Sequence, residues 1–187
     1  MPHGGAPIIT ILGEQVAPGP LRRDLIPTCS RWRNDPVVAR TMAYVAGPVT
    51  LEERAAWFER ASCDSAAIRF AVSVRHFWQA IGITNLHGID GHHGTAEFVL
   101  MIGEADARGQ GLGTETTRLM LAYAFSSLRL HNVVLRVSEY NHAGIRAYQK
   151  AGFREFGRRQ QSHCFCRPPL GRGLHAVPGQ RVHRRRP

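Results

Sequence analysis

The segment Arg108-Gly109-Gln110-Gly111-Leu112-Gly113-Thr114 combines residue types that can bind an anion. Glycine lacks a Cβ atom, so the backbone can approach a ligand closely and adopt dihedral angles that other residues avoid. The segment follows a short apolar run, Glu97 to Ile102, and precedes a long apolar helical pattern, Gly111 to Leu128. Because the first amides of a helix and its dipole favour negative charge, this order predicts a pyrophosphate site.

Two other phosphate-binding loops are excluded by composition and spacing. The Walker loop needs a lysine after its last glycine, and the only lysine of the chain is Lys150. The dinucleotide-binding fingerprint needs the spacing Gly-x-Gly-x-x-Gly, whereas the glycines here are Gly109, Gly111 and Gly113. A glycine-rich turn alone is often only a tight turn, so its specificity depends on a second motif.

That second motif begins at Asn141 and continues with Ile145, Tyr148, Lys150, Gly152 and Phe153. It resembles the GNAT signature N-x-x-A-x-x-x-Y-x-K-x-G-F, while Arg108-x-x-Gly111-x-Gly113 resembles the GNAT motif Q/R-x-x-G-x-G/A. One departure is the pair Ala143-Gly144, which puts Ala one position early and Gly where Ala is usual. The resemblance covers roughly residues 8–162 and is most specific over 95–157, with the polyamine and ribosomal-protein acetyltransferase branches most similar.

The resemblance implies an N-acetyltransferase that moves an acetyl group from acetyl-CoA to a primary amine, carried by a small molecule or a protein N-terminus. It places acetyl-CoA in a V-shaped gap between two parallel strands, here 97–103 and 133–140. Backbone groups near Ile102 would pair with the pantetheine arm, and Asn141 would reach it. Arg108 and the amides from Gly109 to Thr114 would hold the pyrophosphate.

Catalysis requires a proton for the departing thiolate and a neutral amine. Tyr148 matches the position of the general acid in many relatives; the alternative is a packing aromatic. Glu97, eleven residues before Arg108, is the candidate general base. The alternative, which has equal weight, is that Glu97 is a surface carboxylate at the end of a strand. His87, His92 and His93 are second candidates, although a histidine-rich loop is more often only solvated.

The acceptor pocket is expected on the N-terminal helices. Trp32, Asp35 and Trp57 are its candidate residues, with Arg31 and Phe58 beside them. Acids in this region could suit a cationic amine, but Glu53 is already explained as part of a helix cap. The sequence does not choose the acceptor.

Hydrophobic periodicity indicates one mixed α/β domain over residues 1–162. The resemblance adds a mostly antiparallel sheet with a parallel V-shaped splay, flanked by helices. The expected elements are a strand at 8–12, a helix at 21–34 interrupted near Pro27, a capped helix at 50–61, strands at 68–74, 80–84 and 97–102 with a turn at 85–94, a helix at 111–128, a strand at 133–137, a helix at 141–151 and a strand from 153.

Residues 163–187 form a tail that departs from the family. The net charge is +10, yet residues 1–157 hold 16 of the 24 basic residues and all 14 acids. Nucleic-acid binding is therefore not expected of the domain and remains open only for the tail. We expect disorder beyond about Arg167 and no final strand, because prolines and unpaired charge oppose sheet formation. Either a functional basic arm or a shifted reading frame near residue 164 would explain this, and we favour the shift.

The remaining composition suggests an ordinary soluble protein. No apolar run is long enough to span a membrane and no signal peptide is evident, so a cytoplasmic location is expected. The pair Cys164 and Cys166 beside His163 lacks a second cysteine pair, so we expect no metal. A second copy of the chain is a candidate partner. There are two alternative functions. One is acetyl-CoA binding with little catalysis, because the last strand is expected to be lost, and the other is a basic-tailed protein associated with nucleic acid or the ribosome.

Overall fold

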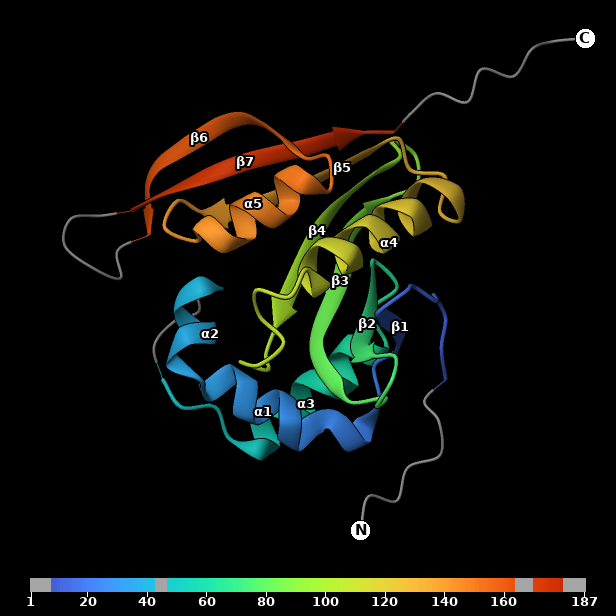
Figure 1. Cartoon of the computed structure of the whole chain (residues 1–187), viewed down its shortest axis with the longest axis vertical. Helices are drawn as coiled ribbons and strands as arrows, with labels where there is room; N and C mark the ends of the chain where they lie inside the picture. The colour runs from blue at the N-terminus through green and yellow to red at the C-terminus, as the bar shows by residue number, and fades with distance from the viewer. Residues whose placement is uncertain (1–7, 43–46, 164–169, 180–187) are drawn as a thin grey trace, which may run out of the picture.

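The fold is a seven-stranded sheet with helices on both faces, seen in a computed structural model that describes residues 8–42, 47–163 and 170–179 (Figure 1). The strand order is β1-β2-β3-β4-β5-β7-β6. The strands are β1 (Val16–Pro20), β2 (Ala67–Val74), β3 (Ala80–Asp90), β4 (Thr95–Ile102), β5 (Asn132–Ser138), β6 (Arg154–His163) and β7 (Leu170–Pro178). The helices are η1 (Arg23–Leu25, 3-10), α1 (Ile26–Asn34), α2 (Pro36–Thr41), α3 (Leu51–Ser62), α4 (Leu112–Ser126) and α5 (His142–Lys150).

One pair of neighbouring strands is parallel, and it forms the expected splay. β4 and β5 pair only from Thr95 with Asn132 to Glu97 with Val134, and beyond these residues the ladder stops. The described pairs on either side are antiparallel. The mixed sheet with a parallel splay is therefore confirmed.

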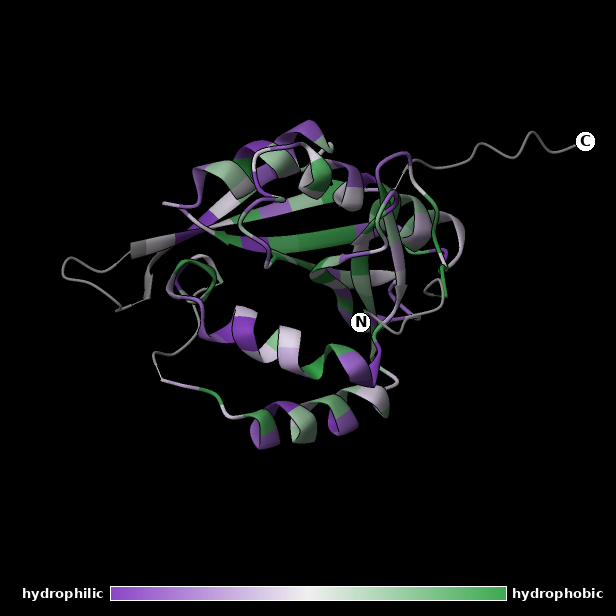
Figure 2. Ribbon diagram, turned by 60° about the horizontal axis from the view of Figure 1, so that its bottom comes forward, coloured by the Kyte–Doolittle hydropathy of each residue, from purple (hydrophilic) through white to green (hydrophobic). Residues whose placement is uncertain are grey.

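Two layers of helices enclose the sheet (Figure 2). On one face α4 and α5 bury their apolar sides against the sheet, with Phe98, Met120 and Leu135 almost fully buried. On the other face a smaller cluster joins Cys29, Trp32 and Val38 to Ile83 and Met101. Since successive side chains of a strand alternate in direction, Phe98 faces α4 and α5 while Met101 faces α1.

The helix starts follow their capping residues. Thr50 and Glu53 form the expected reciprocal capping box of α3, and Asn141 caps α5 by accepting from the Gly144 amide at 2.9 Å. Pro27 lies in the first turn of α1, where a missing N–H costs nothing. It therefore starts the helix instead of interrupting it.

The first strand is not where the sequence predicts it. Residues 8–12 are irregular, with Ile8 72% exposed, and β1 follows at Val16–Pro20. Pro18 and Pro20 disfavour a strand in general, but β1 is an edge strand and needs ladder donors on one side only. The β-branched run at 8–12 therefore does not mark the first strand, which is determined by pairing at the edge of the sheet.

The predicted long turn at 85–94 is also wrong. β3 continues to Asp90, and the turn to β4 is short. Gly88 has φ +57 at a register shift between His87 and Asp90, so it supports a bulge within the strand. Asp90 then accepts hydrogen bonds from the amides of His92 and His93, which closes the turn.

The prediction of a missing last strand is wrong. β7 inserts between β5 and β6 and pairs from Asn132 with Pro178 to Ser138 with Arg172. Its glycines and arginines hide the apolar alternation, but Leu174 and Val177 pair within the ladder, and His175 is 1% exposed. Disorder beyond Arg167 is thus contradicted for 170–179, and the expected shift of reading frame loses its basis. The other tail residues, 164–169 and 180–187, lie outside the described residues. Cys164 and Cys166, considered above as metal ligands, are among them.

No helix within the described ranges is both long and apolar enough to cross a bilayer. In the same residues no group of three or more His, Cys, Asp or Glu side chains could hold a metal ion.

Candidate active site

The glycine loop presents a row of backbone donors at the start of α4. Gly109 and Gly111 have φ +77 and +85, values that favour glycine, and Gly111 is the N-cap. The Thr114 and Glu115 amides donate to Gly111 O, whereas those of Gly109 to Gly113 have no hydrogen-bond partner among the described residues. Five free amides at a helix N-terminus can hold an anion such as a pyrophosphate.

Other parts of the loop hold its shape. The side chain of Gln110 donates to Asp106 O, and Leu112 is buried in the main core. An added Cβ at Gly109 or Gly111 would meet no atom within 4 Å, so space is open around the loop. These observations are consistent with a pyrophosphate bound beside the loop.

Arg108 points away from this row of amides. Its guanidinium donates to Gly103 O at 2.8 Å, to Ile102 O at 3.3 Å and to Asp35 Oδ2 at 3.3 Å. It therefore joins the end of β4 to the N-cap of α2, because Asp35 also accepts from the Val37 amide. Arg108 acts as a positioning residue for the loop, which the motif alone could not show.

Replacing Arg108 by Ala is expected to raise the KM for acetyl-CoA about tenfold, because each charge-assisted hydrogen bond contributes about 1.5–3 kcal/mol. Asp35→Asn is the matched control: its side-chain oxygen can still cap α2 while the charge on Arg108 loses its partner. Steady-state kinetics should show a smaller rise for Asp35→Asn. Equal effects of the two variants would mean that the bonds to Ile102 and Gly103 are unimportant.

The backbone of Ile102 points into the splay. Gly103 N donates to Ile81 O at 2.8 Å, toward β3. Because backbone groups alternate in direction along a strand, the N–H and C=O of Ile102 face the side of β5. Its carbonyl accepts a hydrogen bond from Arg108, and its amide stays the candidate donor to the pantetheine arm.

Asn141 lies at the end of the splay after β5. Its Oδ1 caps α5, while no described residue binds its Nδ2. A Cβ added at Gly144 would lie 2.7 Å from that Nδ2. The departure from the family pattern at Gly144 thus gives the Asn141 side chain room, and its amide can donate to a carbonyl in the gap.

Tyr148 lies between α5 and β4. Its ring contacts Phe98 and Phe153 edge-on, with centroids 6.2 and 6.0 Å away. The hydroxyl has no hydrogen-bond partner among the described residues, and burial raises the pKa of Tyr148 to about 12. The phenol is therefore protonated at neutral pH, as a general acid must be.

Glu97 lies where β4 and β5 begin to diverge, on the same sheet face as Met101. Arg136 donates to both of its carboxylate oxygens at 2.7 Å, and His87 Nε2 lies 3.8 Å from Oε1. The hydrogen bond to Glu97 raises the pKa of Arg136. The environment expected of a base, a carboxylate buried without a cation, is not present at Glu97.

Trp32 belongs to the core instead of an acceptor pocket. It is 1% exposed, and its Nε1 donates to Glu104 Oε1 at 3.0 Å. Arg31 also binds Glu104, and this bond holds the pKa of Glu104 below its usual value. Trp32 thus supports the end of β4, because Gly103 lies directly against its ring.

Replacing Gly103 by Ala is expected to cost about 1–3 kcal/mol of unfolding free energy, because the added methyl overpacks the core. The new Cβ would lie 2.2 Å from ring atoms of Trp32. Gly91→Ala is the control, since no atom lies within 4 Å of that position. Urea unfolding followed by Trp fluorescence would measure both, and equal stabilities would contradict the close contact.

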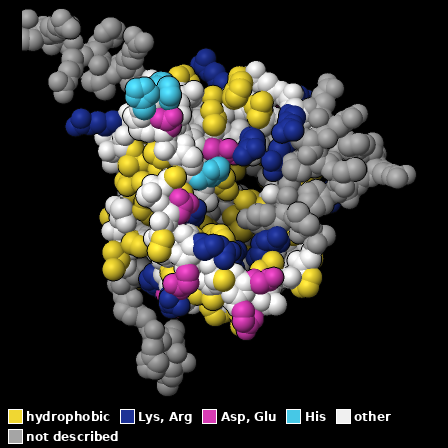
Figure 3. Space-filling model, turned by 180° about the vertical axis from the view of Figure 1, so that it is seen from behind, with side chains coloured by type: hydrophobic (Ala, Val, Ile, Leu, Met, Phe, Trp, Pro, Cys, Tyr) yellow, Lys and Arg dark blue, Asp and Glu magenta, His cyan; other side chains and the backbone are white. Residues whose placement is uncertain are grey.

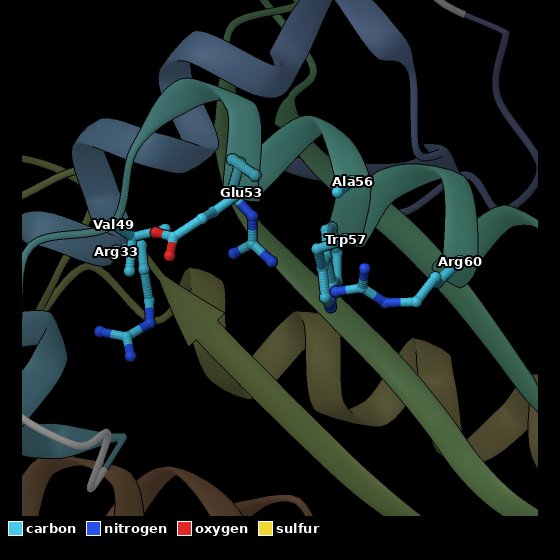
Figure 4. A pocket seen from close by; sticks show the side chains of 7 residues that line it. Arg33, Val49, Glu53, Ala56, Trp57 and Arg60 are labelled. Atoms are coloured by element: carbon cyan, nitrogen blue, oxygen red, sulfur yellow. The ribbon is translucent and has the colours of Figure 1, made fainter.

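Trp57 lines a pocket of about 370 Å³ between α3 and the end of α1 (Figure 4). The other lining residues are Arg33, Val49, Glu53, Arg54, Ala56 and Arg60. The Arg54 guanidinium lies 3.8 Å from the centre of the Trp57 ring. Sequence reasoning missed the arginines, although Glu53, Ala56, Trp57 and Arg60 recur at the spacing of one helix face.

Comparisons with known proteins agree with this geometry. A family profile described as "Acetyltransferase (GNAT) domain" matches residues 19–154. Human alpha/beta-tubulin-N-acetyltransferase 9 is 30% identical over 161 residues, covering 78% of this chain and 75% of the human protein. Spermidine N(1)-acetyltransferase of Escherichia coli K12 is 35% identical over 90 residues, covering 48% of this chain and 47% of that enzyme.

Among solved structures, the spermidine N-acetyltransferase of Vibrio cholerae in complex with CoA and spermine shares the fold. Its TM-score is 0.81 at 22% identity, covering 89% of this chain and 96% of that one. The splayed strands and the free amides before α4 define a CoA-dependent acyltransferase. The chain belongs to the GNAT acetyltransferase family, and it is an N-acetyltransferase with acetyl-CoA as co-substrate.

Proposed function

We propose that the chain acetylates a primary amine presented in the splay between β4 and β5, with Tyr148 as the general acid. The observation that carries this proposal is the row of five free amides, Gly109 to Gly113, at the start of α4. The phenol of Tyr148 on α5 and the backbone amide of Ile102 on β4 are the other two groups of the proposed site. Together they supply anion binding, carbonyl polarisation and a proton.

Acetyl-CoA supplies the thioester whose carbonyl the amine attacks. The chain contributes orientation through the amides of the loop, the Ile102 amide and the Asn141 side chain. Tyr148 gives its hydroxyl proton to the departing thiolate, and burial keeps that proton in place until it is needed.

Proton removal from the amine is assigned to solvent in this proposal. Both carboxylate oxygens of Glu97 accept hydrogen bonds from Arg136, so the carboxylate is already bound to a guanidinium. His87 lies opposite Glu97 in the β3–β4 register and is half-exposed. The role that we propose for Glu97 is to hold the Arg136 side chain where β4 and β5 begin to diverge.

The acceptor is a protein N-terminus or a small amine, because the human relative is named for tubulin and the bacterial one for spermidine. Thiol release from acetyl-CoA, measured with a library of peptides and polyamines, tests the reaction. Turnover with at least one primary amine is expected. Failure of every amine, although acetyl-CoA raises the melting temperature, would favour binding without catalysis.

That alternative has lost its structural argument, because β7 is present and completes the sheet beside β5. A cytoplasmic location and a homodimer stay predictions. Nucleic-acid binding by the basic tail stays one as well, and residues 180–187 lie outside the described part of the chain.

A further inference from the structure

The pocket beside α3 carries an excess of positive charge. Its lining holds the three arginines Arg33, Arg54 and Arg60 and one acid, Glu53. Glu53 accepts from the Thr50 amide at 3.0 Å within the capping box, so its carboxylate serves the helix start. The pocket is therefore suited to negative charge.

The sequence of α3 separates its charges by face. Residues 53, 56, 57 and 60 follow the i, i+3, i+4, i+7 spacing and lie along the pocket, whereas Glu52 and Glu59 fall on another side of the helix. Glu59 is paired with Arg23. In Figure 4 the labelled side chains of Trp57 and Arg60 extend from α3 to the same side as Arg33 from α1.

Positive charge also lies on β5 and β7, on the other side of the splay from β4. Arg136 and Arg172 lie on the same sheet face, because Arg172 pairs with Ser138, two residues after Arg136. Glu97 is paired with Arg136, and burial together with Arg136 lowers the pKa of Arg172. Figure 3 shows Lys and Arg side chains on both sides of a hollow in this face.

The end of α1 lines the pocket, and the residue after α1 contacts the end of β4. Arg33 precedes by two residues Asp35, whose carboxylate binds Arg108 at the end of β4. Residues 33 and 35 therefore join the pocket lining to the end of the strand that borders the splay.

Three acids of this region already have partners. Asp35 is paired with Arg108, Glu104 with Arg31, and Glu53 with the cap of α3. A polyamine would bring further positive charge to a site lined by arginines, which is unfavourable. Trp57 adds a flat apolar surface, held by Arg54, against which a peptide chain can pack.

We infer that the acceptor is the N-terminus of an acidic peptide segment, whose carboxylates bind the pocket formed by Arg33, Arg54, Arg60 and Trp57. This rests on the proposed N-acetyltransferase function and names its substrate class. The amine enters the splay while the acidic residues that follow it lie along α3.

The test uses three amidated peptides that begin with Ala and continue with three Glu, three Gln or three Lys, together with spermidine. Thiol release by the full chain should give a kcat/KM for the Glu peptide at least about tenfold above that of the Gln peptide. The Lys peptide and spermidine should be poorer still. Equal or better turnover of any of these three would overturn the inference and leave the acetyltransferase function intact.

Arg60→Glu is the decisive variant, because Arg60 is exposed and forms no ion pair with a described residue. It should lower kcat/KM for the Glu peptide at least about tenfold more than kcat/KM for the Gln peptide, and the melting temperature of the variant checks its folding. Arg129→Glu makes the same charge change at an exposed position after α4 and should keep the preference. An unchanged preference in Arg60→Glu would overturn the inference.

Binding is measured separately from turnover, by fluorescence anisotropy of a labelled Glu peptide. Binding that Arg60→Glu weakens about tenfold, without thiol release from any amine, would support the pocket and contradict the proposed catalysis. No binding by the wild-type chain would overturn the inference. So would a single-stranded oligonucleotide of equal charge that binds more tightly than the peptide.

Discussion

Replacing Tyr148 by Phe is expected to lower kcat by about 10²- to 10⁴-fold, the range typical of a lost general acid. The KM for acetyl-CoA should stay nearly constant, because the hydroxyl makes no hydrogen bond to a described residue and the ring remains packed against Phe98 and Phe153. Stopped-flow or steady-state thiol release with a reactive amine measures both constants.

The folded stability of Tyr148→Phe is the control for this result. The lost hydroxyl has no partner to leave unsatisfied, so the melting temperature should be equal to or above that of the wild type. Full turnover by the variant would show that Tyr148 is only a packing aromatic. A fall in kcat together with a lower melting temperature would point to distortion instead of lost acid catalysis.

The pH dependence of stability follows from the same burial. The pKa of Tyr148 rises from 10.0 to about 12 on folding, so the folded state binds more protons between these values. The contribution is therefore complete below pH 10 and is lost as pH rises through 12. Tyr148→Phe should flatten the fall in stability over that window.

Replacing Gly111 by Val is the second change with a large expected effect. A β-branched residue at φ +85 costs about 1–2 kcal/mol, and the side chain would crowd the amides of the loop. The dissociation constant for acetyl-CoA should rise at least about tenfold, measured by calorimetry.

Gly111→Asn is the matched control, because Asn has a similar size and tolerates positive φ. It should keep more affinity for acetyl-CoA than Val does. If both variants lose affinity equally, crowding explains the effect and backbone strain does not. If neither loses affinity, the row of amides from Gly109 to Gly113 is not the pyrophosphate site.

The loop and the Tyr148 segment could be predicted from sequence because each depends on local chain. Glycines at 109 and 111 mark positive φ, and Asn141 marks a helix start, so neighbours within a few residues specify the geometry. The splay followed from the family resemblance, and the ladder between β4 and β5 does end after Glu97.

The edges of the sheet could not be predicted in this way. Both β1 and β7 have sequences that disfavour strands, with prolines in one and glycines and arginines in the other. Their pairing partners, β2 and β5, lie tens of residues away and supply the ladder that local propensity lacks. Long-range pairing therefore decided both cases.

Side-chain direction was the other missing information. The sequence placed Arg108, Glu97 and Trp32 close to the correct strands and helices. It could not show that Arg108 turns to Ile102 and Gly103, that Arg136 holds Glu97, or that Trp32 is covered by Gly103.

The insertion of β7 between β5 and β6 also constrains the order of folding. β1 to β4 pair with neighbours in chain order, so this half of the sheet can form while the chain is being synthesised. β6 has its one described partner strand in β7, and β5 keeps an open edge until residues 170–178 arrive. The nascent chain therefore exposes an unpaired strand edge late in synthesis, a stage at which aggregation competes with completion of the sheet.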